Sequence, residues 1–106
     1  MNPLTLEWIA KAEGDYATAR REIRARKNPN YDAACFHAQQ CVEKYLKSLL
    51  QELNISFGRT HNLIALLDML LGNYPQLELI RPELEYLSVF AVMFRYPGES
   101  ADKEIA

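Results

Sequence analysis

Histidine, cysteine and glycine are scarce in this chain of 106 residues, and each shortage argues against a class of site. The two histidines, His37 and His61, form no His-x-x-x-His or Glu-x-x-His pair, so the usual helical metal motifs are missing. The four glycines make neither a phosphate-binding loop nor a nucleophile elbow. We therefore expect no metal and no cofactor.

The cysteine content points to buried thiols. Cys35 and Cys41 are the only two cysteines of the chain. Six residues apart on one helix, they would be separated by about 9 Å along its axis, which is beyond the reach of a disulfide. We interpret them as buried free thiols of a reducing cytoplasm, in preference to a metal or redox role.

Long apolar runs and an excess of positive charge are also missing. No apolar run approaches the ~18 residues of a membrane-spanning helix, and the N-terminus has no secretory pattern. The formal net charge is -2, so nucleic-acid binding would require a local basic patch. With 49% apolar and 25% charged residues, the sequence predicts one folded cytoplasmic domain over residues 1–106, without a membrane anchor.

The stretch from Tyr31 to Leu53 organises the rest of the sequence. Its apolar residues recur at steps of three and four, which predicts an amphipathic helix of about six turns. A second line of residues keeps helical spacing along one edge of the apolar stripe and is polar: His37, Gln40, Lys44 and Lys47. Such an edge is either solvated surface or the wall of a polar site. The pair Glu43 and Lys47 has the favoured i,i+4 orientation, and helix stabilisation is a sufficient explanation for it.

Helix start and stop signals predict three further helices, at about 3–27, 60–71 and 77–94. Asn2 can cap the first helix and Asn30 the next one, and the break at residues 28–30 is short enough for antiparallel packing of these two helices. Gly58 is free to adopt a left-handed conformation in the loop before the third helix.

The late part of the chain adds two expectations. Pro82 marks a fresh start or a bend in the helix predicted over residues 77–94. The segment after Pro97-Gly98 has the pattern of a fifth helix that stops after about one turn. The predicted fold class is therefore all-α, an up-and-down antiparallel four-helix bundle with a truncated fifth helix.

Two features of the first helix are candidates for function. Asp15 lies beside the apolar seam formed by Leu4, Trp8, Ile9, Ala12, Tyr16, Ala19 and Ile23. It therefore needs a cationic or hydrogen-bonding partner, unless it reaches water at the edge of the bundle. Five of the twelve basic residues gather at the end of this helix, namely Arg20, Arg21, Arg24, Arg26 and Lys27. The helix dipole explains them, and a phosphate-facing patch is the less favoured alternative because no aromatic residues are interleaved.

Two other features lie later in the chain. We expect His61 in the first turn of the third helix, where the helix dipole disfavours a charged imidazole. A capping or packing histidine is the simpler interpretation of that residue. The apolar surface of the fourth helix is wider than one bundle seam requires, so Val89, Phe90, Met93 and Phe94 indicate contact with another chain.

Four segments together resemble a known family. They are KAEGDYATAR (residues 11–20), FHAQQCVEKYLKSLL (residues 36–50), THNLIALL (residues 60–67) and FRYPGE (residues 94–99). In this order they resemble the HEPN domain (higher eukaryotes and prokaryotes nucleotide-binding), over nearly the whole chain. The combination of His-x-Gln-Gln-x-x-Glu-Lys-x-x-Lys with a late Arg-Tyr-Pro is the specific part of the resemblance.

The resemblance implies a helical bundle of four or five helices that is often a homodimer. Many members of the family pair with a minimal nucleotidyltransferase, sometimes as toxin and antitoxin, and others bind nucleotides or RNA. The positions that the resemblance marks as candidates for nucleotide or anion binding are Asp15, His37, Lys44, Lys47, His61, Arg95 and Tyr96, with Glu43 as a further position to examine.

Ribonuclease members of the family carry an arginine followed, after four to six residues, by a histidine. Arg95 matches the arginine by its place before Tyr96 and Pro97, but no histidine follows it in this sequence. The acid/base partner that such chemistry needs is therefore missing from that motif. The leading hypothesis is a non-catalytic binding module. The alternatives are a metal-independent ribonuclease in which His61 or His37 replaces the missing histidine, and a scaffold whose polar residues are purely structural.

Overall fold

The computed structural model describes the backbone of residues 1–93 and the side chains of residues 1–89. Its helices are α1 (Pro3–Arg24), α2 (Tyr31–Glu52), α3 (Leu63–Leu70) and α4 (Arg81–Met93), with a 3-10 helix over Pro75–Ile80. Residues 1–93 contain no strand, so the prediction of an all-α helical bundle is confirmed. The predicted fifth helix lies outside the described residues.

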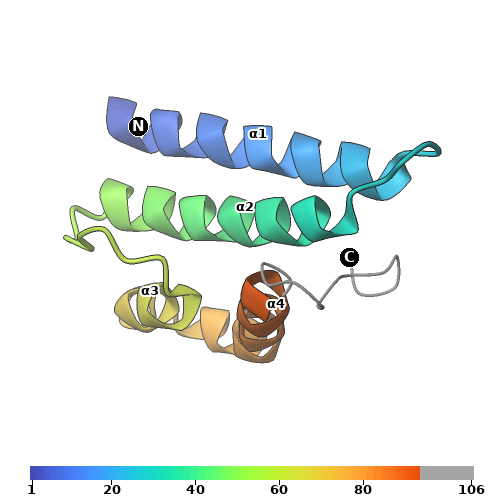
Figure 1. Ribbon diagram of the computed structural model, residues 1–106. Coiled ribbons are helices and arrows are strands. Elements are labelled where there is room, and N and C mark those ends of the chain that lie inside the picture. The colour runs from blue at the N-terminus through green and yellow to red at the C-terminus, as the bar shows by residue number, and fades with distance from the viewer. Residues whose placement is uncertain (94–106) are drawn as a thin grey trace.

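Helix α2 occupies the middle of the molecule (Figure 1). Helix α1 lies along one side of it and runs antiparallel to it, while α3 and α4 pack on the other side. Among the described helices, α1 contacts α2 alone. The result is an elongated molecule with principal extents of 42 × 26 × 23 Å.

Asparagine side chains begin the first three helices. The side-chain oxygens of Asn2, Asn30 and Asn62 accept backbone N–H bonds of 2.8, 2.9 and 3.1 Å from the first turns of α1, α2 and α3. These bonds satisfy N–H groups that have no partner inside the helix. The caps predicted at Asn2 and Asn30 are therefore confirmed.

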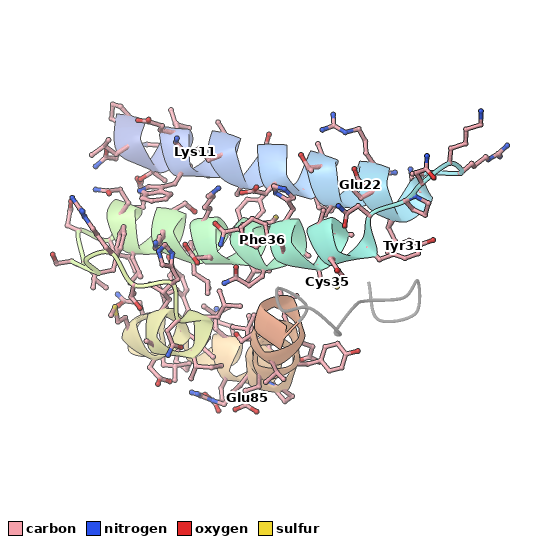
Figure 2. The ribbon with its side chains drawn as sticks, in the orientation of Figure 1. Lys11, Glu22, Tyr31, Cys35, Phe36 and Glu85 are labelled. Atoms are coloured by element: carbon pink, nitrogen blue, oxygen red, sulfur yellow. The ribbon has the colours of Figure 1, made fainter. Side chains whose placement is uncertain are left out.

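The first helix is shorter than the predicted range of 3–27. It ends at Arg24, because Ala25 is extended with φ −62° and ψ 132°. The chain needs the following residues to reverse direction, and the Glu22 carboxylate accepts the backbone N–H of Asn30 at 2.9 Å across this turn. Figure 2 shows Glu22 and Tyr31 at the same end of the α1–α2 hairpin. The prediction that residues 25–27 are helical is wrong.

The fourth predicted helix, at 77–94, divides into two elements. The 3-10 helix over residues 75–80 comes first, and α4 starts at Arg81 with Pro82 in its first turn. A proline is tolerated there because an N–H in the first turn has no partner inside the helix. Pro82 therefore marks a fresh start. Gly58 has φ 62°, the left-handed conformation expected of it.

The apolar core lies between α2, α3 and α4. It consists of Leu46, Leu50, Leu63, Leu66, Leu67, Leu70 and Leu84. The opposite interface, between α1 and α2, is different, because the buried residues of α1 are Thr5, Ala12 and Asp15. Leu4 and Tyr16, which were predicted in the seam of α1, are 52% and 54% exposed. A helix that packs against a single neighbour buries a narrow strip, so these two predictions are wrong.

Candidate functional site

A buried carboxylate of α1 organises the first group of polar residues. Asp15 Oδ1 lies 2.8 Å from His37 Nδ1, and Asp15 Oδ2 accepts a bond of 2.5 Å from Lys44 Nζ. Both partners come from α2, so the carboxylate joins the two long helices. The prediction that Asp15 needs a cationic partner is confirmed, and the alternative of a solvated edge is wrong, since its side chain is 11% exposed.

These partners set the protonation state of Asp15. Burial acts to raise the pKa of its carboxyl group, but the hydrogen bonds from Lys44 and His37 outweigh that effect and hold the pKa below its ordinary value. The aspartate therefore stays ionised at neutral pH and holds the Lys44 ammonium and the His37 imidazole at the hairpin interface.

A second carboxylate, Glu43 of α2, is more deeply buried, with 2% of its side chain exposed. Its Oε2 lies 3.1 Å from Lys47 Nζ and 3.0 Å from His61 Nδ1, and its Oε1 accepts a bond of 3.3 Å from Gln39 Nε2. Burial acts to raise the pKa of Glu43, but the bonds from His61, Lys47 and Gln39 hold it below its ordinary value. The pair of Glu43 and Lys47 is therefore buried, and through His61 it links α2 to the loop before α3. This role goes beyond the helix stabilisation that the i,i+4 spacing indicated.

The Lys47 ammonium is enclosed by groups of this chain. Its side chain is 5% exposed, and Nζ lies 5.3 Å from the ring centroid of Trp8 and 5.8 Å from that of Phe57. The two rings meet edge to face, with centroids 5.9 Å apart. Carboxylate and aromatic faces together replace the water around the charge. Lys47 thus connects α1, α2 and the loop before α3.

His61 is the most exposed member of the two groups, with 75% of its side chain accessible. It lies in the loop one residue before the cap Asn62, so the prediction that it belongs to the first turn of α3 is wrong. Its Nδ1 faces Glu43, and Gln39 also approaches its backbone oxygen with Nε2 at 3.4 Å. This arrangement fixes the ring and leaves Nε2 available to a ligand.

A cavity of about 520 Å³ opens beside this imidazole. Its walls come from α2, the start of α3 and α4, and they are Gln39, His61, Asn62, Ile64, Glu85, Ser88 and Val89. The buried Ser88 Oγ has no hydrogen-bond partner among the described residues. The cavity can therefore present the oriented imidazole of His61 to a small ligand, while the Ser88 hydroxyl oxygen is buried in its wall.

The structure brings the predicted residues together in two separate groups. His37 and Lys44 join Asp15, while Lys47 and His61 join Glu43. Arg95, Tyr96 and Phe94 lie outside the described residues, and the side chains of Phe90 and Met93 are outside the described side chains, so the apolar surface expected there stays a prediction.

Sequence reasoning missed Gln39, Trp8 and Phe57 as parts of these networks. For Gln39 a signal was present, because Gln39, Glu43 and Lys47 follow one another at steps of four and so share one face of α2. The two rings carried no such signal, since their approach to Lys47 depends on the packing of α1 and of a loop.

Comparison with known proteins places the chain in a family. The sequence model of the HEPN domain matches residues 5–106, so this protein belongs to the HEPN family. No curated protein and no solved structure matches the chain. None of the described helices is long and apolar enough to cross a membrane.

Proposed function

We propose that this protein is a homodimeric HEPN binding module that partners a minimal nucleotidyltransferase and binds a nucleotide or RNA. Membership of the family supports the class of function. The observation that carries the proposal is the Glu43–His61 pair, in which a buried carboxylate holds an exposed imidazole at the edge of a cavity of about 520 Å³.

The exposure and pairing of the residues in the two groups indicate which of them can contact the ligand. Lys47 is enclosed and paired with Glu43, while Lys44 is 23% exposed and paired with Asp15. Among the candidates with described side chains, His61 is the most exposed, with 75% of its side chain accessible against 30% for His37. A protonated imidazole donates a charge-assisted hydrogen bond to a phosphate oxygen. We propose that His61 contacts the ligand together with Arg95 and Tyr96, and that Asp15, His37, Lys44 and Lys47 hold the scaffold.

Exposed apolar residues support the dimer. Leu79, Tyr86 and Val89 are 81%, 51% and 59% exposed, and they lie on the 3-10 helix and on α4. Large apolar side chains gathered on neighbouring elements are a common feature of protein interfaces. We therefore expect α4 to contribute to the contact between two copies, which light scattering coupled to size exclusion would measure as twice the monomer mass.

The binding proposal is tested with a fluorescent ATP analogue and a matched pair of histidine variants. His61→Ala removes the imidazole at the cavity and should weaken binding about tenfold, the loss of one charge-assisted hydrogen bond. His37→Ala removes the imidazole of the other group and should leave binding within about twofold. Equal affinities of both variants and the unchanged protein would contradict the proposed site. Co-purification with a nucleotidyltransferase encoded in the neighbouring reading frame tests the partner, which could form a toxin–antitoxin pair with this chain.

The same pair of residues favours a second candidate, a metal-independent ribonuclease. A carboxylate that holds Nδ1 of an imidazole leaves Nε2 to exchange a proton with a substrate, as general acid/base catalysis requires. This activity would cleave RNA in the presence of EDTA, and His61→Ala would lower the rate by about 100-fold or more, while His37→Ala would not. Intact RNA after prolonged incubation with the unchanged protein would exclude it.

A further inference from the structure

The basic residues at the end of α1 differ from the other cations of the hairpin. Lys44 and Lys47 are each held by a buried carboxylate. By contrast, no carboxylate of the described residues pairs with Arg20, Arg21, Arg24, Arg26 or Lys27. The helix dipole accounts for positive charge at this end. It does not account for two of the arginines bordering an apolar groove.

That groove has a volume of about 450 Å³ and lies where three helices approach one another. The described parts of α1 and α4 both pack near α2 but do not contact each other, so the space between them is open. Its apolar lining comes from all three helices, with Ala19 and Ile23 on α1, Ala38 and Val42 on α2, and Leu87 on α4. Arg20 and Arg24, one turn apart on α1, border it.

A second hollow, of about 500 Å³, lies on the other side of the same two arginines and is lined by α1 and the residue after it. Arg20 and Arg24 therefore form a ridge between two hollows. Their guanidinium groups can reach an occupant of the apolar groove while the aliphatic parts of their side chains contribute to its wall.

From these features we propose that the groove binds an amphipathic, acidic helix of a partner protein. The apolar face of that helix would cover the groove lining, and its carboxylates would pair with Arg20 and Arg24. Recognition of an amphipathic helix by a groove between helices buries apolar area, and guanidinium–carboxylate pairs fix its orientation. The proposal does not depend on what occupies the cavity beside His61.

The lining of the groove favours a protein helix over RNA. Phosphates would suit the two arginines, but a nucleic-acid strand gains little from aliphatic walls. Single-stranded nucleic acid binds through several stacked aromatic side chains, whereas Tyr16 is the one aromatic residue among the described residues that line this groove. A helix with one acidic and one apolar face would pair with the arginines and cover the apolar lining at the same time.

The test uses a fluorescein-labelled helical peptide of about 18 residues, long enough to hold helical structure, with leucines along one face, glutamates beside them and alanines elsewhere. Fluorescence anisotropy with the full chain should show saturable binding. The double variant Arg20→Glu and Arg24→Glu should weaken it at least tenfold. The matched control, Arg26→Glu and Lys27→Glu, changes the charge equally outside the groove and should stay within about twofold at ~0.15 M salt, where charges are screened beyond about 8 Å.

A separate variant and an NMR experiment test whether the apolar lining of the groove contacts the peptide. Ile23→Ser should weaken peptide binding while its thermal melting curve confirms that it is folded. In NMR spectra of the labelled full chain, the peptide should shift the amides of residues 16–24 and 38–42 and that of Leu87. Shifts confined to other regions would overturn the proposal.

Four other outcomes would also overturn it. They are equal affinity for a peptide with lysines in place of glutamates, equal losses in the two charge-reversed variants, displacement of the peptide by single-stranded RNA, and NMR contacts in the free protein that place residues 99–106 in the groove. Self-association that disappears in the Arg20→Glu and Arg24→Glu variant, without peptide binding, would assign the groove to a second copy and would likewise refute a partner helix.

Discussion

Substitution of Glu43 by glutamine should destabilise this protein more than any other single change to its polar networks. The substitution keeps the size and shape of the side chain but removes its charge. Lys47, with 5% of its side chain exposed, would then lie between Trp8 and Phe57 without a counter-ion. His61 would lose its charged partner in the same step.

The magnitude follows from the burial of this pair. Removing one partner of a buried ion pair leaves an uncompensated charge and costs about 3–5 kcal/mol. The cation–π contacts with Trp8 and Phe57 persist and offset up to about 2 kcal/mol of that cost. We expect a net loss of about 1–5 kcal/mol, a substantial part of the roughly 5–15 kcal/mol by which such a domain is stable.

Urea denaturation followed by circular dichroism measures this loss. The midpoint should fall while the slope of the transition stays constant, and Tm should drop by about 4 °C for each kcal/mol. The exposed pair of Glu78 and Arg81 supplies the control, because Glu78→Gln removes a carboxylate that accepts hydrogen bonds of 2.6 and 2.8 Å but has 54% of its side chain open to water. That control should leave the midpoint nearly unchanged.

A third variant separates the charge from the packing. The double substitution Glu43→Leu and Lys47→Met replaces the pair by apolar side chains of similar volume, which is often neutral or stabilising when the ions were fully buried. It should therefore recover most of the stability lost in Glu43→Gln. A midpoint for Glu43→Gln equal to that of the unchanged protein would refute the view that a buried charge pair holds α1, α2 and the loop together.

Three further predictions concern other parts of the structure. The folded-state pKa values of Asp15 and Glu43 lie below their ordinary values of 3.8 and 4.5. The two carboxylates therefore contribute to stability above these values, and the contribution is lost as the pH falls below them. Asp15→Asn should reduce the fall in the free energy of unfolding between about pH 5 and pH 2, measured by denaturation. Burial raises the thiol pKa of Cys35 and Cys41, so Ellman's reagent should label them slowly in the native protein and rapidly in urea, and fast native labelling would contradict their burial. Asn62→Ala removes the cap of α3 and should cost about 1 kcal/mol in urea denaturation, whereas an unchanged midpoint would show that the cap is dispensable.

Which structural features could be predicted from the sequence depends on how far apart in the sequence the interacting residues lie. Helical periodicity and capping residues are local, so the sequence predicted α2 to within one residue of its end and the starts of α1 and α2. The end of α1 was not predictable to the same accuracy, because it depends on how the turn closes on Glu22. The buried strip of α1 was also misjudged, since periodicity does not show that α1 packs against one helix alone among the described helices.

The candidate site shows the same division. Sequence alone determined that Asp15 lies near an apolar seam and requires a partner, that His37, Lys44 and Lys47 share one region of a helix, and that the chain resembles the HEPN family. Local spacing also indicated the pair of Glu43 and Lys47. Only the tertiary structure decided which carboxylates meet Lys44 and His61, because Asp15 and Lys44 are 29 residues apart and Glu43 and His61 are 18 residues apart. Contacts at such separations depend on how whole helices and loops pack, and no local pattern of residues encodes that packing.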